Sequence, residues 1–450
     1  MSYADFLAAK KRRVNTLGRP VTLDQINGDL FDWQQAIVQW AVQRGRAAIF
    51  ADCGLGKTFM QLEWARLSAE RSLILAPLSV ARQTAREAVK LGTTATYVRD
   101  PDDVTEPGIY VSNYEMAHHF DPAAFGAVVL DESSILKNVD GPTRRRLTEQ
   151  FAGVPARLAC TATPAPNDVA ELCNHAEFLG ILPRAEMLSA YFVHDEDGWR
   201  VKGHASEPMH EWIAQWATAL RRPSDLGWED DGYQLPDLRI HPEVIDVDIE
   251  ADGQLFATEL GGVGGRSNVR RKTLDERCDR AIELASDPDE QWVVWCGLND
   301  EADKVARAVP GAVNVQGSTA PDEKAEALEA FQDGSIRVLV TKPQIAGFGM
   351  NFQQCHKMAF VGLNDSYEAY YQAVRRCWRF GQQHPVDVHV VVSSLERQIV
   401  ENVRRKENEA SSTTEALIRH SQVRRADDRH GDSAVRDGRS SGGVMATAAR

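Results

Sequence analysis

Residues 372–382, with the sequence QAVRRCWRFGQ, gather one glutamine and three arginines in a short segment. A helix over this segment would place four side chains at positions i, i+3, i+4 and i+7, and so on one face: Gln372, Arg375, Arg376 and Arg379. A guanidinium group is always charged and presents a fork of donors, which suits a triphosphate or a nucleic-acid backbone. For an arginine cluster considered by itself, the alternative is a solvated basic helix.

The second chemical signature is the segment Ala51–Thr58 (ADCGLGKT), far upstream of the arginines. It follows the strand-like RAAIF and precedes the helix-like TFMQLEWARL, and the backbone N–H groups of such a turn can cradle phosphates. Gly54 and Gly56 supply the glycine-rich turn itself. Lys57 would reach the β- and γ-phosphates, and Thr58 would hold Mg²⁺. Together the two signatures predict a site for ATP and Mg²⁺ built from distant parts of the chain.

A third signature is the acidic pair in Leu130–Asn138 (LDESSILKN), which directly follows the apolar run Ala127–Val129. Asp131, at the end of the expected strand, would bind Mg²⁺, and Glu132 would act as general base on the attacking water. Hydrolysis needs two carboxylates because the metal occupies one of them. Such a pair alone often marks only the start of a loop, but its place after a phosphate loop favours the catalytic interpretation.

Composition limits the class of protein. The chain has 450 residues, 43% hydrophobic and 26% charged, as expected for a soluble globular protein of two or three domains. We expect no membrane span or secretion signal. Seven scattered cysteines without a C-x-x-C pair favour reduced thiols over a disulfide framework or a zinc ribbon. The net charge of −14 argues against a small basic module that coats nucleic acid, but not against a local basic channel.

Short apolar runs alternate with helical patterns twice along the chain, which predicts an α/β fold with two parallel-sheet domains. The runs are 47–51, 72–76, 109–112, 127–130 and 156–160 in the first half, and 292–296, 312–316, 338–341, 357–361 and 386–392 in the second. We predict four regions: an ATP-binding lobe at 1–190, a hairpin and helix insertion that connects the lobes at 191–240, a second lobe at 241–410 and a disordered tail at 411–450.

The ordered motifs resemble those of superfamily-two helicases and, among them, the Swi/Snf-type DNA translocases. In the first half the resemblance rests on LFDWQ at 30–34, DCGLGKT at 52–58, APLSV at 76–80, VSNYE at 111–115, DESS at 131–134 and TATPAPN at 161–167. It implies that Gln34 contacts the adenine base and that Thr161 and Thr163 couple the nucleotide site to movement. Ser133 and Ser134 depart from the usual alanine and histidine, which puts the details of that coupling in doubt.

In the second half the resemblance rests on VVWCGL at 293–298, GFGMN at 347–351 and QAVRRCWRFGQ at 372–382. It implies that Gly349 lies close to phosphates, that Gln372 belongs to the catalytic set, and that Arg376 and Arg379 are arginine fingers. Arg375 falls outside the family pattern and is expected to contact DNA or solvent. TKPQIA at 341–346 departs from the family's usual S-T-R-A-G and resembles a compact form found in phage-encoded proteins.

The resemblance implies two tandem RecA-like lobes with an ATP cleft between them, and a DNA-dependent ATPase that works as a helicase or a double-stranded DNA translocase. Its expected partner is DNA, mostly duplex and contacted through the backbone, with replication or recombination proteins as further partners. We expect a monomer in the cytoplasm of a bacterial or phage-infected cell. Two alternatives stay open: an ATP-gated nucleic-acid clamp or assembly factor that does not translocate, and an RNA helicase.

Overall fold

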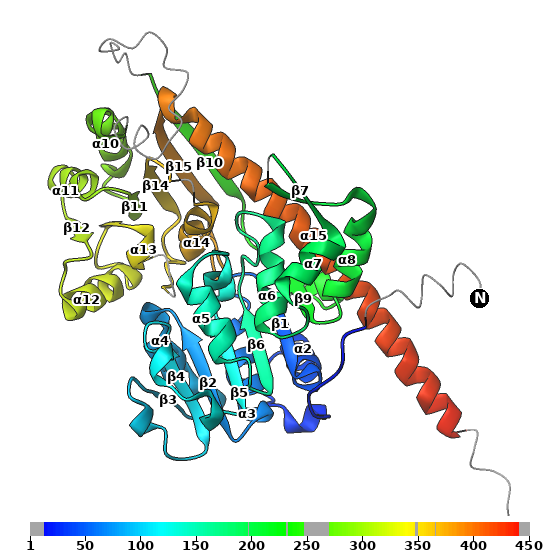
Figure 1. Cartoon of the computed structure of the whole chain (residues 1–450). Coiled ribbons are helices and arrows are strands. Elements are labelled where there is room, and N and C mark those ends of the chain that lie inside the picture. The colour runs from blue at the N-terminus through cyan, green and yellow to red at the C-terminus, as the bar shows by residue number, and fades with distance from the viewer. Residues whose placement is uncertain are drawn as a thin grey trace, which may run out of the picture. The chain divides into compact units, whose positions relative to one another are not determined.

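The computed structural model describes residues 13–196, 198–230, 233–246, 270–346, 350–364 and 366–440. The chain forms two compact units (Figure 1). The first unit comprises Met1–Ala76, Thr84–Asp230 and Ala410–Arg450, and the second comprises Pro77–Gln83 and Asp231–Glu409. Among the described residues, no helix is long and apolar enough to cross a membrane.

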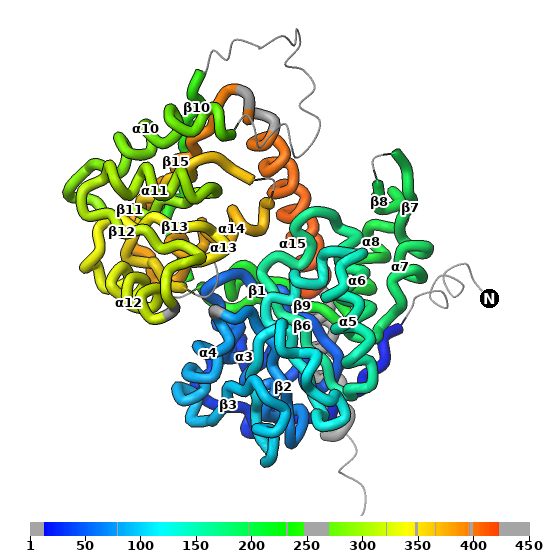
Figure 2. The backbone as a smooth tube through the Cα atoms, turned by 60° about the vertical axis from the view of Figure 1, so that its left-hand side comes forward, coloured from blue at the N-terminus to red at the C-terminus, as the bar shows by residue number. Residues whose placement is uncertain are grey.

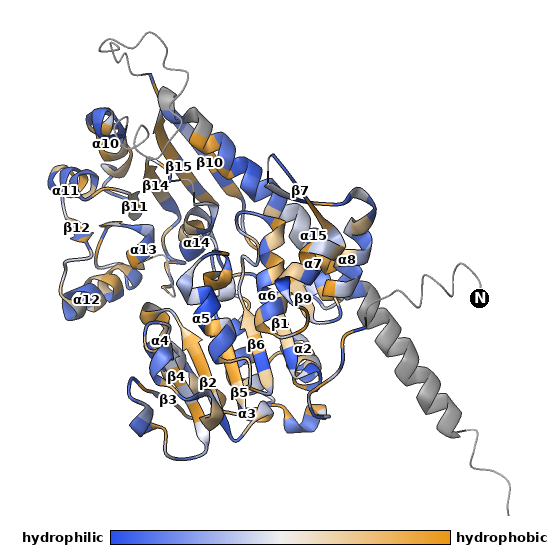
Figure 3. Ribbon diagram, viewed as in Figure 1, coloured by the Kyte–Doolittle hydropathy of each residue, from blue (hydrophilic) through white to orange (hydrophobic). Residues whose placement is uncertain are grey.

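The first unit is built on a seven-stranded sheet in which all pairings are parallel. The strand order is β3-β4-β2-β5-β6-β1-β9, and the strands are β1 (Arg46–Ala51), β2 (Arg71–Ala76), β3 (Ala95–Tyr97), β4 (Gly108–Asn113), β5 (Ala127–Asp131), β6 (Ala156–Cys160) and β9 (Ala217–Leu220). Strands buried on both faces need apolar residues throughout, and β2, β5 and β6 are drawn largely in hydrophobic colours in Figure 3.

Helices cover this sheet and enclose one large core. They are α2 (Asp32–Arg44), α3 (Lys57–Ser68), α5 (Pro142–Gln150), α6 (Leu172–Phe178), α7 (Arg184–Tyr191) and α8 (Ser206–Ile213). Helix α4 (Leu78–Glu87) is divided between the two units after Gln83. Short 3₁₀ helices join them, including η6 (Ser133–Leu136) and η7 (Val169–Glu171). The core continues from the strands into α6, α7 and α8.

The segment 191–240 contributes β9 to the first sheet and ends at the start of β10 (Leu238–Ile245), the first strand of the second sheet along the chain. The hairpin predicted at its start is confirmed as β7 (Phe192–Asp195) paired antiparallel with β8 (Gly198–Val201). The predicted helix that follows is α8, which ends at Ile213 and so includes Trp212 but not Trp216. Trp216 packs edge-on against Trp212 just before β9, which forms an edge strand beside β1. Both tryptophans lie in the core.

The second unit contains a six-stranded parallel sheet (Figure 2). Its order is β10-β15-β14-β11-β13-β12, with β10 (Leu238–Ile245), β11 (Trp292–Cys296), β12 (Ala312–Val315), β13 (Val338–Thr341), β14 (Lys357–Val361) and β15 (Val386–Ser393). Its helices are α10 (Leu274–Ala285), α11 (Asn299–Ala308), α12 (Pro321–Gln332), α13 (Pro343–Ala346), α14 (Tyr367–Cys377) and the start of α15 (Arg397–Ser440). The two parallel α/β sheets confirm the predicted fold class.

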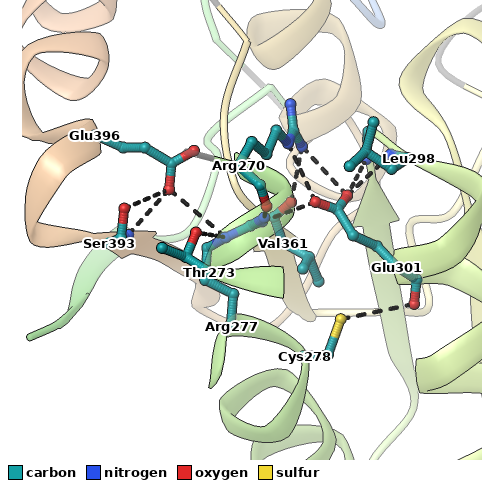
Figure 4. A network of polar contacts seen from close by, with 10 residues as sticks. Arg270, Thr273, Arg277, Cys278, Leu298, Glu301, Val361, Ser393 and Glu396 are labelled. Atoms are coloured by element: carbon teal, nitrogen blue, oxygen red, sulfur yellow. Dashed lines mark hydrogen bonds and ion pairs between the residues drawn. The ribbon is translucent and has the colours of Figure 1, made fainter. Parts of the chain in front are cut away.

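A buried ionic network fixes helices α10 and α11 to the second sheet (Figure 4). Glu301, with no exposed side-chain surface, accepts hydrogen bonds from Arg277 Nη1 at 2.8 Å and Arg270 Nε at 3.1 Å. The backbone N–H groups of residues 297 and 298 also donate to it, each at 2.9 Å. Arg277 lies 3.6 Å from a second carboxylate, Glu396, which caps the end of β15 through Ser393. Every charge in this network therefore has an opposite charge beside it.

The tail expected to be disordered from residue 411 is instead helical as far as Ser440, where α15 ends. Its polar composition hid two adjacent apolar side chains, Leu417 and Ile418, which join the core of the first unit. Polar contacts hold the same stretch: Arg221 Nη2 donates to the Ser411 carbonyl at 2.9 Å, and His420 contacts Glu207 at 2.9 Å. Residues 441–450 lie outside the described residues.

Candidate active site

Three neighbouring strands of the first sheet end at the predicted nucleotide-binding residues. The order β5-β6-β1 is parallel, with Asp131 opposite Cys160 and Cys160 opposite Ile49. The carboxyl ends of these strands therefore lie level at one edge of the sheet. Loops at this edge are the usual ligand-binding places in open α/β sheets.

The phosphate loop leaves β1 and ends where α3 begins at Lys57. Gly54 and Gly56 have φ of 85° and 69°, a conformation that other residues avoid, so both glycines are required by the turn. Lys57 Nζ donates to the carbonyl of Ala51 at 2.9 Å and to that of Asp52 at 3.2 Å. In the hydrogen bonds described, the Lys57 ammonium therefore donates only to neutral acceptors. Thr58 follows in the first turn of α3, as predicted.

Gln34, the predicted base contact, lies against this loop. Its Oε1 accepts from the backbone N–H of Phe31 at 3.1 Å, and its Nε2 donates to the Leu55 carbonyl at 3.1 Å. A Cβ added to Gly56 would come within 2.5 Å of Gln34 Nε2. The glutamine and the phosphate loop are therefore packed as one unit.

Asp131 is buried at the end of β5 and is held in place from several sides. Its Oδ1 accepts from Gln61 Nε2 at 2.7 Å and from the backbone N–H of Glu132 at 3.1 Å, and its carbonyl accepts from the Tyr114 hydroxyl at 2.6 Å. Burial raises the pKa of Asp131, although the Gln61 hydrogen bond and the charge of Lys57 oppose this rise. A buried carboxylate whose charge is only partly balanced fits a site for a divalent cation.

Glu132 is the one non-glycine residue with positive φ among the described residues, at φ 54° and ψ 55°. Its Oε2 accepts from the Thr161 hydroxyl at 3.4 Å, and Thr161 Oγ1 also accepts from the backbone N–H of Thr163 at 3.1 Å. The structure therefore brings the predicted general base and the predicted coupling threonines together. Both belong to loops that leave neighbouring strands, β5 and β6.

In the second unit the predicted arginine face takes a different form from the one expected. Helix α14 ends at Cys377, because Trp378 leaves helical geometry, so Arg379 lies beyond the helix. Arg376 and Arg379 nevertheless converge: their Nη1 atoms donate to the same carbonyl, that of Met350, at 3.2 and 3.1 Å. The predicted shared helical face was wrong for Arg379, but the two predicted fingers lie together.

The remaining residues of this set are buried. Arg375 was expected to meet DNA or solvent, but only 2% of it is exposed, and its guanidinium lies 4.8 Å from the centroid of the Trp378 ring. Gln372 is also buried, and no hydrogen bond to its side-chain amide is found within the described ranges. Gly349 lies outside the described residues.

Sequence reasoning missed three residues at the first site: Gln61, Tyr114 and His175. Gln61 could have been found, because it lies four positions after Lys57 on α3 and so shares its face. Tyr114 lies within the VSNYE segment, but its hydroxyl donates to the carbonyl of Asp131, on a strand formed by a later part of the sequence. His175 contacts Ser133 Oγ through Nε2 at 3.1 Å, and no spacing in the sequence indicates that contact.

The chain is similar in sequence to known proteins. Residues 275–381 match the family described as the helicase conserved C-terminal domain. The TATA-binding protein-associated factor mot1 of Schizosaccharomyces pombe is 27% identical over 158 residues, 33% of this chain and 8% of that protein. The SWI/SNF-related matrix-associated actin-dependent regulator of chromatin subfamily A-like protein 1 of Xenopus tropicalis is 20% identical over 405 residues, 82% of this chain and 43% of that protein. The chain thus spans less than half the length of these two relatives.

Two solved structures are also similar. S. cerevisiae Dbp5 bound to RNA and ADP BeF3 has a TM-score of 0.54 at 12% identity, over 86% of this chain and 93% of that one. The Sulfolobus solfataricus SWI2/SNF2 ATPase core in complex with dsDNA has a TM-score of 0.42 at 18% identity, over 89% of this chain and 96% of that one. The Dbp5 likeness confirms the expected pair of tandem RecA-like lobes. Residues 275–381 are thus similar to helicase conserved C-terminal domains, and 82% of the chain is similar to one SWI/SNF-related protein.

Proposed function

We propose that this chain is a DNA-dependent ATPase that couples ATP hydrolysis to movement along duplex DNA. The observation that carries the proposal is the carboxyl edge of the first sheet, where the charge of Lys57 acts on Asp131 and Glu132 follows Asp131 at the end of β5. The helicase C-terminal match at residues 275–381 adds the second lobe that such a motor needs. The chain's similarity to SWI/SNF-related proteins favours DNA over RNA as the track.

In this proposal the first lobe binds the nucleotide. Backbone N–H groups of the loop that contains Gly54 and Gly56 cradle the phosphates, and Lys57 neutralises part of their charge. Thr58 and Asp131 are the residues that would hold Mg²⁺, which supplies charge stabilisation to the phosphoryl group being transferred. Gln34 reads the base from its place beside the loop.

Glu132 is the proposed general base. Its carboxylate accepts from Thr161 at 3.4 Å, which orients it without neutralising it, and it lies next to the metal-binding Asp131. A base in this position takes the proton of the attacking water as the bond to phosphorus forms. This division of labour needs two adjacent carboxylates, and β5 supplies them in sequence.

Arg376 and Arg379 are the proposed arginine fingers, with Gln372 and Gly349 as further contacts to the nucleotide. Fingers from the second lobe make hydrolysis depend on closure of the two lobes, so each turnover includes a change of domain arrangement. Most contacts to DNA would go to phosphates, which predicts little sequence preference and a strong dependence on salt.

The test compares the ATPase rate of the full chain without polymer and with single-stranded DNA, duplex DNA and RNA, using Lys57→Ala as the inactive control. The proposal predicts the largest stimulation by duplex DNA, greater on long duplexes and minicircles than on short oligomers. No stimulation by any polymer would overturn it. Equal stimulation by short and long DNA would favour a clamp, and preferential stimulation by RNA an RNA helicase.

A second measurement separates translocation from strand separation. Displacement of a third strand from a DNA triplex reports movement along a duplex, whereas release of one strand of a forked duplex reports unwinding. We expect triplex displacement that depends on ATP hydrolysis and disappears in Lys57→Ala. If the chain unwinds the forked duplex but does not displace the third strand, its proposed function changes from duplex translocase to strand-separating helicase.

A further inference from the structure

Glu132 needs an external support, because its backbone has the left-handed conformation that non-glycine residues rarely adopt. On its N-terminal side, strand β5 and the contacts of Asp131 fix the chain. On its C-terminal side begins η6 (Ser133–Leu136), a short 3₁₀ helix with little strength of its own. The direction of the Glu132 side chain therefore depends on what holds η6.

Helix α6 supplies that support. His175 Nε2 lies 3.1 Å from Ser133 Oγ, and Asn174 Nδ2 donates to the carbonyl of Leu136 at 2.9 Å. One helix thus binds both the first and the last residue of η6. All four residues are buried, so water does not compete for these hydrogen bonds.

The surroundings of His175 define which atom donates. Its Nδ1 lies 3.4 Å from the Glu171 carbonyl, which can only accept, so the proton of the neutral ring belongs on Nδ1. Burial lowers the pKa of His175 to about 4, so the ring is neutral near pH 7. Nε2 is then an acceptor, and the Ser133 hydroxyl donates to it. The ring also meets Phe50 of β1 edge-on, with 5.3 Å between ring centroids.

The same part of the chain holds the neighbouring loop. Glu171, four residues before His175, accepts from Asn167 Nδ2 at 2.9 Å and from the Asn167 backbone N–H at 3.2 Å. Asn167 ends the loop that begins at Thr161, whose hydroxyl reaches Glu132. Residues 171–175 therefore hold both loops that meet at the Glu132 carboxylate.

We propose that His175 is a positioning residue for hydrolysis: by accepting the Ser133 hydroxyl it fixes η6 and so aims the Glu132 carboxylate. This inference rests on the proposed ATPase function and assigns a role to Ser133, the residue that departs from the family's usual alanine. His175 itself is fully buried, so its proposed effect is transmitted through Ser133.

The test is a double-mutant cycle on the full chain, with the DNA-stimulated kcat and the KM for ATP measured for Ser133→Ala, His175→Leu and the double variant. Each single variant should lose about 10-fold in kcat, a part of what a general base contributes, while KM changes less than twofold. Because both changes remove one interaction, the double variant should be no worse than the worse single variant. His175→Gln, whose amide can still accept from Ser133, should regain part of the rate.

His210→Leu is the matched control, because His210 is a buried histidine of the same unit on α8 whose ring contacts the Ser206 carbonyl and His420. It should keep kcat within twofold. Thermal melting identifies variants that fail to fold: if His175→Leu melts early, the comparison of Ser133→Ala with His175→Gln decides instead. Unchanged kcat in Ser133→Ala, or multiplied losses in the double variant, would overturn the positioning role. An inactive wild-type chain would instead overturn the proposed ATPase itself.

Discussion

Two buried arginines of the second unit have opposite surroundings. Arg277 lies between Glu301 and Glu396 (Figure 4), so its charge is balanced within the fold. Arg376 is nearly as buried, but its guanidinium donates to the carbonyls of Gln372 and Met350 and pairs with no carboxylate among the described residues. Burying an unbalanced charge is costly. Arg376 carries this cost in free energy at the place where the negatively charged nucleotide is proposed to bind.

Buried carboxylates show the same contrast. Burial alone would raise the pKa of Glu301, but Arg270 and Arg277 outweigh it and lower that pKa below its ordinary value. For Asp131 the effect of burial prevails, and its pKa is raised. Glu171 behaves like Asp131, with a pKa of about 7 caused mainly by burial. The charges of Arg277 and Glu301 are thus balanced within the fold, whereas those of Asp131 and Arg376 are not fully balanced by the side chains around them.

The largest effect is expected from removing a finger. Arg376→Ala and Arg379→Ala should each lower kcat by about 10³-fold, because the group that stabilises transition-state charge is lost. Binding of a fluorescent ATP analogue should stay within about threefold, and the melting temperature should not fall. Steady-state kinetics and analogue titration check this. Parallel loss of analogue binding and thermal stability would show that Arg376 is structural, like Arg277.

The converse change is Arg277→Ala, which leaves two carboxylates without their shared cation. It should lower the free energy of unfolding by about 3–5 kcal/mol, the usual effect of breaking a buried ion pair. Denaturant titration measures this, and Arg419→Ala, which removes an exposed ion pair with Glu207, is the control, expected to lose less than about 1 kcal/mol. If both variants lose the same amount, the network contributes no more than a surface pair.

Asp131→Asn tests the unbalanced carboxylate of the first unit. It should lower kcat by at least about 10²-fold, since metal-assisted charge stabilisation is worth several kcal/mol. The amide removes a buried charge, so the melting temperature without nucleotide should rise or stay constant. A variant that melts early, or that keeps its Mg²⁺-dependent activity, would contradict the proposed metal site.

Glu171→Gln tests the smallest effect, a pH dependence of stability. Between about pH 4.5 and 7 the unfolded chain has lost the Glu171 proton while the folded chain still holds it, so wild-type stability falls as pH rises through this window. His175 makes stability rise with pH, because its pKa is lowered to about 4 in the folded chain. This contribution is the same in wild type and in Glu171→Gln, so it cancels in the comparison. Glu171→Gln should therefore gain on the order of 2 kcal/mol over wild type between pH 4.5 and 7.5. Parallel stability curves from urea titrations would contradict this.

The sequence predicted the parts of the fold that depend on local patterns. All ten apolar runs form strands, because a strand buried on both faces leaves a continuous apolar signal. Strands β3, β9 and β10 were missed, since β3 and β9 have three and four residues and β10 contains alternating polar residues. The burial of tail residues such as Leu417 could not be predicted from the sequence, because it depends on the surface of the first unit that they cover.

The candidate site divides in the same way. Lys57, Thr58, Asp131 and Glu132 could be proposed from the sequence because each lies in a short segment at a strand end. The role of His175 depends on contacts with Ser133, far away in sequence, and no local pattern encodes it. The early end of α14 was also not predictable, because the residues beyond Cys377 have no proline or turn signal before Gly381.

The hydrogen bond between Gln34 and the Leu55 carbonyl links the proposed base contact to the shape of the phosphate loop. If a base binds the Gln34 amide, the hydrogen bond from this amide to the loop changes. If the loop changes its shape, the position of the amide that binds the base changes in turn. Linkage requires these two effects to be equal in free energy. A nucleotide with the wrong base would then be penalised at its phosphates as well as at its ring, so selectivity would extend to the turnover rate.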